Sequence, residues 1–306
     1  MKKVASLGSG KTTKSKEKSK IVIELRRQFP EFSTIKWLKI IDLPKSSFYE
    51  WLEKLEEINV KDKNDTKLIK EIVDDSKGTY GYRRVTIAMR NKGIFINHKR
   101  VLRLMKKNDL ICNKYTRSSR GYSSFKGEIG KIADNKINRD FKASSMYEKW
   151  VTDVTEFRIP GIDKKLYLSP IMDLYNKEII SYSLSIRPTV NFTNKALKLA
   201  LNVLPKNHSL TIHSDQGFHY QHKSWINELY KHGVIQSMSR RGNCLDNSSM
   251  ENFFGILKQE MFYGVKFNSI SELEREIRNY IYWYNNERIK ANLNGMSPVE
   301  YRKHTA

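Results

Sequence analysis

The sequence predicts an α/β fold, a mixed β-sheet with helices on both faces, preceded by an all-helical N-terminal region. Between residues 21 and 112 the apolar residues recur at helical spacing. From residue 150 onward, three strand-like runs joined by short turns are followed by alternating helical and strand-like segments. Such an order is typical of a sheet covered on both faces. The 306 residues suffice for two or three domains, each with its own core.

The composition favours a polyanionic partner. The formal net charge is +23, far more than solubility requires, and nucleic acid is the partner that best explains it. No stretch approaches the ~20 apolar residues of a membrane span, and the N-terminus lacks the apolar core of a signal peptide. Cys112 and Cys244 are too few for a disulfide framework or a cysteine-based zinc site. We therefore expect a cytoplasmic protein without a membrane partner.

The first 20 residues predict a flexible basic arm, because they hold seven lysines and a single acid. Within the arm, Gly10-Lys11-Thr12 resembles part of a phosphate-binding loop. Such a loop needs a buried strand before it and a helix after it, and neither is expected here. The arm therefore predicts no ATP binding.

Residues 21–60 are interpreted as a helix-turn-helix-like unit. A helix from Ile21 to Phe29 is followed by one from Ile35 to Ile41 with Ser33 as its N-cap, and a third helix runs from Ser46 to Leu55. Helix, short turn and helix with a basic, hydroxyl-bearing start is the pattern of a DNA-binding motif. The candidate DNA contacts are Lys45, Ser46 and Ser47. A plain helical hairpin is the alternative.

Residues 64–112 predict a second helical unit that binds DNA. One helix runs from Tyr80 to Met89 and another from Asn97 to Met105, with apolar residues on one side and basic residues on the other. Basic side chains of this kind position a protein on phosphates. The candidates are Arg83, Arg84, Lys99, Arg100 and Arg103. A solvated charged face is the alternative. Residues 113–146, rich in Lys, Arg, Ser and Gly, predict a basic linker.

Residues 147–268 predict the catalytic domain and residues 269–306 a helical extension, whose aromatic residues we expect mostly in the core. The order of segments in the catalytic domain is that of a ribonuclease-H-like fold with a five-stranded mixed sheet. The expected strands are 151–159, 166–174, 179–186, 210–214 and 234–238; the expected helices are 194–204, 224–232 and the segment around Glu251.

Three carboxylates are candidates for metal-dependent chemistry on nucleic acid. Asp153 lies in the first expected strand, Asp215 follows the fourth, and Glu251 lies on a helix; 35 residues separate the last two. Phosphodiester chemistry can use two divalent ions about 3.5–4 Å apart, and Mg²⁺ prefers carboxylate oxygens. Asp153 and Asp215 become neighbours if their strands pair.

Further candidates surround these three acids. Asn247, Glu251 and Lys258 are spaced to share one helical face, so Asn247 and Lys258 are expected near the substrate DNA. Arg240 and Arg241 lie in a loop that could touch the DNA backbone. The candidate set excludes five other residues, Glu156, Asp173, Asp246, His213 and His219; an N-cap role is the ordinary explanation for Asp246, and a lone histidine is more often structural.

Four segments resemble the family-three transposases of bacterial insertion sequences, relatives of retroviral integrases. They are Trp150-Val-Thr-Asp153, His213-Ser-Asp215-Gln-Gly, Ser237 to Asn247 with Arg-Arg-Gly-Asn inside it, and Glu251-Asn-Phe-Phe-Gly-Ile-Leu-Lys258. The resemblance covers about residues 64–306 and includes Tyr80-Gly-Tyr-Arg-Arg and Tyr284-Asn-Asn-Glu-Arg288. Cys244 and Ser248 stand where many members have Pro and Ala.

The resemblance implies that Asp153, Asp215 and Glu251 are the D, D-35-E ligands of two Mg²⁺ ions, which Mn²⁺ can replace, and that Lys258 is the family's basic residue after the glutamate. The implied reaction is nicking at an element end and attack of the freed 3′-OH on target DNA, without ATP. Active members are usually fusions with an upstream reading frame. We therefore expect that frame's product, or the fusion, as a partner, with a homo-oligomer on DNA.

Two other functions remain open at this point. One is a DNA-binding protein with an inactive ribonuclease-H-like domain, acting as a repressor or as a partner of the full enzyme. The other is a ribonuclease-H-like nuclease. Any cleavage would exclude the first, and joined strand-transfer products would exclude the second.

Overall fold

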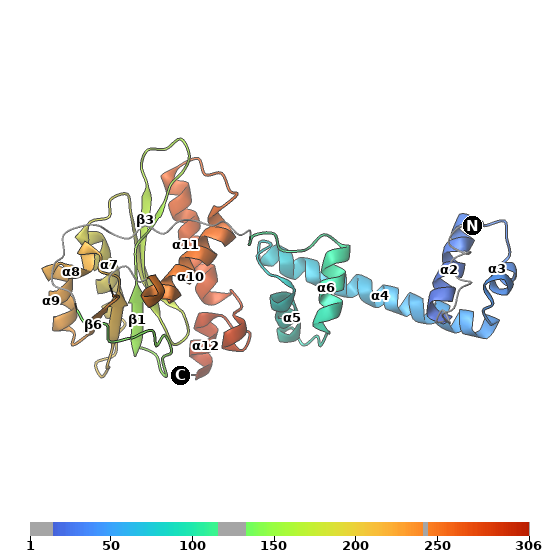
Figure 1. Cartoon of the computed structure of the whole chain (residues 1–306), viewed down its shortest axis with the longest axis horizontal. Coiled ribbons are helices and arrows are strands. Elements are labelled where there is room, and N and C mark those ends of the chain that lie inside the picture. The colour runs from blue at the N-terminus through green and yellow to red at the C-terminus, as the bar shows by residue number, and fades with distance from the viewer. Residues whose placement is uncertain (1–14, 116–132, 241–243, 306) are drawn as a thin grey trace.

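The computed structural model describes residues 15–115, 133–240 and 244–305, and the described chain is elongated (Figure 1). Helices occupy one end and a sheet flanked by helices the other, with a long helix between them. The expected arm at 1–14, most of the expected linker (116–132) and residues 241–243 lie outside the described residues. None of the described helices is long and apolar enough to cross a membrane.

Three helices form the N-terminal end. They are α2 (Ser15–Gln28), α3 (Thr34–Ile41) and α4 (Lys45–Asp75). Their small core consists of Val22, Leu38, Ile41, Leu43 and Phe48. The start of α2 at Ser15 shows that residues 15–20, expected in the flexible arm, are helical.

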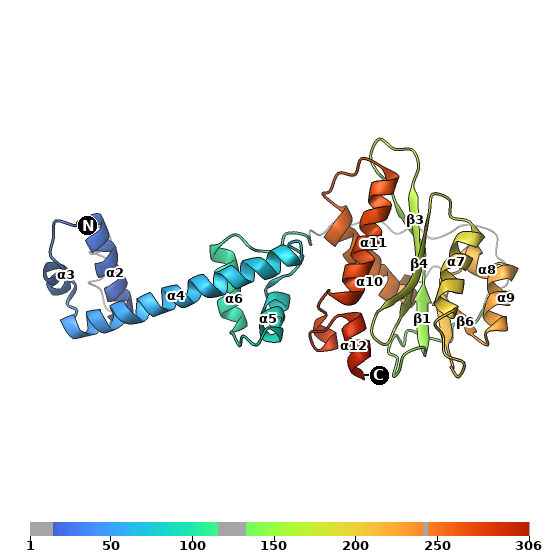
Figure 2. The same cartoon turned by 180° about the vertical axis from the view of Figure 1, so that it is seen from behind.

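Helix α4 is longer than predicted. It was expected to end at Leu55, but it continues through residues 56–63 to Asp75 and runs into the second helical unit (Figure 2). The intervening residues include no Gly or Pro, the two residues that most disfavour a helix interior, so nothing stops the helix. Their side chains are mostly exposed, which explains why the apolar spacing fades there.

The second helical unit consists of the end of α4 with α5 (Tyr82–Asn91) and α6 (His98–Lys107). As predicted, apolar residues of these helices form a core, among them Ile69, Val85, Met89, Val101 and Leu104. Asn97 caps α6 by accepting a hydrogen bond from the backbone N–H of Lys99 (2.8 Å). The basic residues of α5 and α6 lie outside this core.

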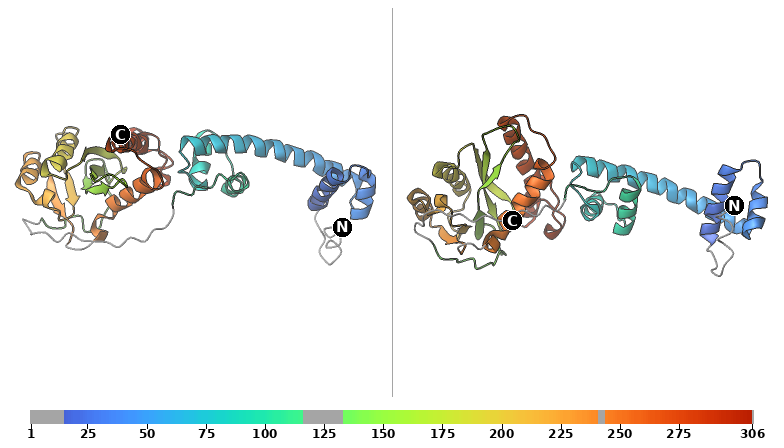
Figure 3. Two further views of the ribbon diagram at one scale, coloured as in Figure 1. Left: turned by 90° about the horizontal axis from the view of Figure 1, so that it is seen from above. Right: turned by 45° about the horizontal axis from the view of Figure 1, so that its top comes forward.

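The C-terminal half is a mixed sheet between two layers of helices, which confirms the predicted fold class (Figure 3). Its strands are β1 (Lys149–Thr152), β2 (Thr155–Phe157), β3 (Leu166–Asp173), β4 (Ile179–Ser185), β5 (Thr211–Ser214) and β6 (Ile235–Met238). β3 pairs antiparallel with β1, β2 and β4, whereas β5 pairs parallel with both β1 and β6.

The strand count differs from the predicted five because the first strand is interrupted. Thr152 pairs with Ile171 and Thr155 with Leu168, so β1 and β2 lie along β3 in one continuous register. Pairing stops only at Asp153 and Val154. The interruption frees the Asp153 side chain from the regular sheet.

Helices cover both faces of the sheet. One face carries α7 (Val190–Leu201), α8 (Phe218–Gln221) and α9 (Lys223–Lys231); the other carries α10 (Ser248–Leu257), α11 (Ile270–Asn286) and α12 (Pro298–Thr305) (Figure 2). Neighbouring strand residues face opposite layers: Trp150 packs with α7 and α9, and Val151 packs with α10 and α11. Two short 3-10 helices, η1 (Cys244–Asn247) and η3 (Ala291–Leu293), and a π-helical turn, η2 (Lys258–Phe262), complete the chain.

Part of the segment expected to be a linker belongs to this domain. Ile137 is 3% exposed and lies in the same core as α10 and α11. The backbone N–H groups of Lys136 and Ile137 donate to the Ser237 hydroxyl. The segment packs because the edge strand β6 offers it acceptors, which the composition alone does not reveal.

We expect Asp173→Asn to lower the free energy of unfolding by about 2–4 kcal/mol, since its oxygens accept from the backbone N–H of Tyr147 and Tyr175 and from the Trp150 indole. An amide NH₂ would face at least one of these buried donors. Urea unfolding followed by tryptophan fluorescence measures the change. Asp163→Asn, at an exposed position of the same domain, is the control, and equal stability of the two variants would contradict the structural role of Asp173.

Candidate active site

The β1–β5 pairing brings the first two candidate acids together. Val151 pairs with His213 in parallel register, so the same register two residues later sets Asp153 opposite Asp215. Adjacent strands lie about 4.8 Å apart, which is close to the separation of paired metal ions in phosphoryl-transfer sites. The site thus lies at the carboxyl ends of parallel strands, where open α/β sheets bind ligands.

The turn after β5 fixes the Asp215 carboxylate. Its Oδ1 accepts a hydrogen bond from the backbone N–H of Gly217 at 2.9 Å. A Cβ on Gly217 would stand 2.9 Å from that same Oδ1, closer than real Cβ contacts allow. The glycine of the Asp-Gln-Gly motif therefore permits the turn that orients Asp215.

Burial raises the pKa values of both aspartates, and repulsion by neighbouring acids adds to the rise at Asp153. Burial is the larger cause for Asp153, followed by the charges of Asp215 and then Glu251, whereas Lys258 acts in the opposite direction. Burial also raises the pKa of Asp215, against the Gly217 hydrogen bond. Like charges held together without a counterion behave in this way, and a bound cation would relieve them.

Glu251 lies on α10, whose apolar residues Met250, Phe253 and Leu257 pack against the sheet. Partial loss of hydration raises the pKa of this glutamate. Within the three described ranges, no group of three His, Cys, Asp or Glu side chains is close enough together to hold one metal ion. The fold therefore pairs Asp153 with Asp215, and Glu251 acts on Asp153 electrostatically from the adjacent helix.

Hydrogen bonding separates the candidate acids from the structural ones. Every acid that is buried in the described chain has both carboxylate oxygens engaged by donors; these acids are Asp173, Glu178, Asp246 and Glu260. In contrast, Asp153 accepts one hydrogen bond, from the N–H of Val154, and Asp215 accepts only that of Gly217. No hydrogen bond or ion pair to Glu251 occurs in the described chain. The open oxygens are hard ligands that suit Mg²⁺ or Mn²⁺.

The other acids weighed in the sequence have structural partners. Glu156 is exposed and pairs with Lys165 at 2.9 Å. Asp246 does not cap a helix; it binds Arg139 and Arg240, and these bonds hold its pKa well below the usual range. Asp246, which follows residues 241–243 in the chain, is thereby tied to Arg240, which precedes them.

The two histidines that flank Asp215 are also structural. His213 is completely buried, with its ring nitrogens 2.8 Å and 3.1 Å from the hydroxyls of Ser237 and Ser239. His219 bonds the Pro188 carbonyl at 2.8 Å. Burial lowers the pKa of both rings, which favours neutral histidines that support the turn around Asp215.

The expectation that Asn247 lies on the DNA-facing side of the helix is wrong. Asn247 is 4% exposed and precedes α10, and its Nδ2 donates to the Thr152 carbonyl at 3.2 Å. That carbonyl lies at the end of β1, where ladder pairing stops, so a side-chain donor is needed. Lys258, by contrast, lies at the end of α10 with its Nζ 5.2 Å from the centre of the Phe157 ring, and its charge acts on Asp153.

The predicted DNA contacts differ in how free their side chains are. Lys45, Ser46, Arg83 and Lys99 are exposed, and Ser47 is half-buried. Arg84 pairs with Glu260 at 3.3 Å, and Arg100 and Arg103 pair with acids of α4 at 2.8–2.9 Å. The Arg240 side chain is 54% exposed beside Asp246. Arg241 lies outside the described residues.

Sequence reasoning missed Glu260, Arg288 and Tyr280, which form a buried polar cluster beyond α10. The one signal in the sequence was Arg288, which lies in the Tyr284-Asn-Asn-Glu-Arg288 motif but was given no role. Its partners come from distant segments, so the sequence pattern alone could not identify them.

Comparisons with known proteins agree with this geometry. An HTH-like domain family matches residues 60–118, and two integrase core domain families match residues 143–244 and 251–305. The chain is 45% identical over 286 residues to the putative transposase InsK of insertion element IS150 from Escherichia coli, covering 94% of this chain and 98% of that protein. The chain belongs to the family-three insertion-sequence transposases.

As a transposase, the chain is a polynucleotidyl transferase with an integrase core, and DNA is its partner. The probable transposase of IS1353 from Shigella flexneri is 35% identical over 290 residues, which are 94% of this chain and 55% of that protein. Among solved structures, the HTLV-2 integrase catalytic core in complex with magnesium matches with a TM-score of 0.40 at 18% identity, over 51% of this chain and 96% of that one.

We expect Asp153→Asn to raise the stability of the metal-free protein at pH 7. The folded-state pKa of Asp153 is raised, so its contribution to stability is present below about pH 4 and lost as pH rises through the folded pKa. Asparagine removes that loss. Thermal denaturation in a chelating buffer at pH 7 and pH 4 tests this.

The gain should vanish at pH 4, where the wild-type carboxylate is protonated. Glu156→Gln removes the same charge at an exposed position and should give no gain at either pH. A destabilised Asp153→Asn protein at pH 7 would contradict the repulsion between Asp153 and Asp215.

Proposed function

We propose that Asp153, Asp215 and Glu251 hold two Mg²⁺ ions, or Mn²⁺ in their place, for nicking at element ends and 3′-OH strand transfer. The observation that carries the proposal is the contrast in hydrogen bonding: these acids keep open oxygens at the carboxyl edge of β1 and β5, whereas the buried acids elsewhere are fully bonded. Bound there, the two ions would activate the attacking oxygen and stabilise charge at the leaving oxygen.

The chain's own groups prepare this chemistry. The register of β1 and β5 fixes the spacing of the two aspartates, and the Gly217 N–H fixes the rotamer of one of them. α10 brings Glu251 close enough to the same edge for its charge to act on Asp153. Lys258, seven residues further on, lies on the same helical face and is placed to bind a substrate phosphate.

The exposed basic residues predicted for DNA binding form the second part of the proposal. Lys45 and Ser46 at the start of α4, with Ser47, are proposed to contact DNA, as are Arg83 and Lys99 on α5 and α6. Arg100, Arg103 and Arg240 have acid partners within the chain, so binding DNA would require them to share or leave those partners.

We also propose that the active form is a homo-oligomer on DNA in the bacterial nucleoid, with an upstream reading-frame product or its fusion as a partner. The Shigella relative, in which the matched region makes up 55% of the protein, shows that further chain can accompany this region in a transposase.

We expect Glu251→Gln to lower nicking and strand transfer by at least about 100-fold while DNA affinity is kept, because the change removes one ligand oxygen with little change of shape. A labelled duplex carrying the element's end, incubated with Mg²⁺ or Mn²⁺, reports both products on a gel. Glu156→Gln is the matched control and should act as wild type. Nicking by Glu251→Gln at the wild-type rate would exclude its role.

Metal binding can be measured without DNA. Millimolar Mn²⁺ should raise the melting temperature of the wild-type protein. At a free Mn²⁺ concentration one hundred times the dissociation constant, the free energy of unfolding should rise by about 2–3 kcal/mol. Asp215→Asn should lose most of this shift, and Na⁺ at equal ionic strength should give none. An equal Mn²⁺ shift in both proteins would place the metal elsewhere.

A further inference from the structure

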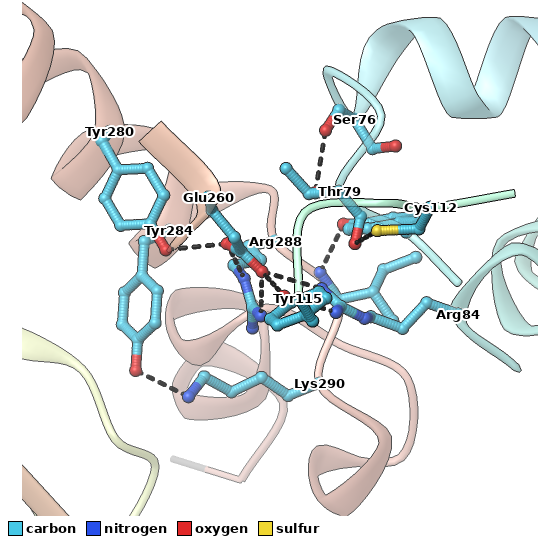
Figure 4. Close-up of polar contacts among 12 residues, drawn as sticks. Ser76, Thr79, Arg84, Cys112, Tyr115, Glu260, Tyr280, Tyr284, Arg288 and Lys290 are labelled. Carbon is cyan, nitrogen blue, oxygen red and sulfur yellow. Dashed lines mark hydrogen bonds and ion pairs between the residues drawn. The ribbon is translucent and has the colours of Figure 1, made fainter. Parts of the chain in front are cut away.

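A buried carboxylate joins the second helical unit to the catalytic domain (Figure 4). Glu260, in the π-helical turn η2, is 4% exposed and has four partners. Arg288 donates from Nε at 2.8 Å and from a terminal nitrogen at 2.6 Å, and the Tyr280 hydroxyl donates at 2.8 Å. Arg84 and the Tyr115 hydroxyl complete the set. We call these five residues the Glu260 cluster.

The partners come from two parts of the chain. Tyr280 and Arg288 belong to the C-terminal extension, in α11 and the segment that follows it. Arg84 lies on α5, and Tyr115 follows α6, so both belong to the helical unit. A carboxylate whose desolvation is compensated by both sides resists separation, because parting the two leaves buried charge short of partners.

Other contacts in the same place show that the two parts are packed together. The Tyr80 hydroxyl accepts from the backbone N–H of Ile289 at 2.7 Å, and Asn91 donates to the Gly295 carbonyl at 2.9 Å. A Cβ on Gly295 would stand 2.5 Å from the Ile87 side chain, so this glycine lets the two surfaces meet. Trp283 of α11 packs on the core of the helical unit.

The helix that carries Glu260 also carries two groups of the active site. Lys258 lies seven positions after Glu251, which is close to two turns, so both lie on one face. Glu260 lies nine positions after Glu251, about half a turn more than two full turns, so Glu260 lies on the opposite face. One continuous helical segment therefore presents the active site on one side and the helical unit on the other.

We propose that Glu260 is a positioning residue: through Arg84 and Tyr115 it fixes the distance between the DNA-bound helical unit and the catalytic carboxylates, and so selects which phosphodiester is nicked. The proposal rests on the function proposed above. The helical unit binds the duplex, and α10 of the catalytic domain carries Glu251. The Glu260 cluster makes the helical unit and the catalytic domain move as one body. A loosened cluster would let the site reach neighbouring phosphates.

The variant must loosen the contact without unfolding the protein. Glu260→Gln would leave Arg288 buried and short of its partner, so the protein could fail to fold. Arg84→Gln is better suited, because Arg84 contacts Glu260 at 3.3 Å and the Tyr115 hydroxyl at 2.8 Å, whereas Arg288 keeps the carboxylate paired within the catalytic domain. Arg90→Gln is the matched control: it removes the same charge from α5 at an exposed position away from Glu260.

Two measurements test the proposal. In the first, spin labels at Lys70 on α4 and Lys195 on α7, in a Cys112→Ser, Cys244→Ser background, report the distance between the two parts by pulsed electron paramagnetic resonance without DNA. In the second, sequencing gels map the nicks on a labelled element end with Mn²⁺. Wild type and Arg90→Gln should give one narrow distance distribution and one nick position.

Arg84→Gln should broaden the distance distribution at least twofold and spread the nicks over neighbouring positions. A loss of stability alone would lower the yield of nicks without moving them. A narrow distribution for Arg84→Gln, identical to that of Arg90→Gln, would overturn the proposal. If that variant also bound DNA more weakly, Arg84 would be a phosphate contact and not part of the interdomain contact. Absence of nicking by the wild-type protein would instead contradict the proposed function, and the distance measurement would still decide the role of the cluster.

Discussion

The parallel pairing of β1 with β5 is the constraint on which the catalytic domain depends. It sets Asp153 opposite Asp215 at one edge of the sheet, and several local features follow from it. Gly217 is needed because the turn after β5 leaves no room for a side chain beside Asp215. Asn247 is needed because the end of β1 leaves the Thr152 carbonyl without a ladder partner. Trp150 and Val151, two residues before Thr152 and Asp153 respectively in the same run, anchor the strand in the two cores on either side of the sheet.

The acids of this chain divide into two groups by their hydrogen bonds. Asp173, Asp246 and Glu260 are buried, fully bonded and hold segments together. Asp153 and Asp215 keep open oxygens and raised pKa values, so they oppose folding at neutral pH in the absence of a cation. A site that destabilises its own fold is consistent with selection for metal binding rather than for stability.

The α10–η2 segment relates the active site to the rest of the molecule. Its two faces carry carboxylates of opposite character, Glu251 with no donor in the described chain and Glu260 with donors on both oxygens. The π-helical turn begins at Lys258, where the backbone N–H of Tyr263 bonds the Lys258 carbonyl at 2.7 Å. Such turns often occur at functional sites, and here the turn lies between a catalytic face and an interdomain contact.

The sequence by itself determined the fold class and the approximate positions of most strands and helices, because these depend on local periodicity. Short motifs such as His213-Ser-Asp215 predict Asp153, Asp215 and Glu251 as the candidate acids. It failed where length or environment decides: α4 runs past Leu55, residues 133–146 pack on the core, and Asn247 is buried. Only the tertiary structure decided which charges pair. Arg84 looked like a phosphate contact, yet its acid partner lies 176 residues away. A guanidinium binds whichever carboxylate the fold brings within about 3 Å. The residues next to Arg84 in the sequence do not reveal which carboxylate that is.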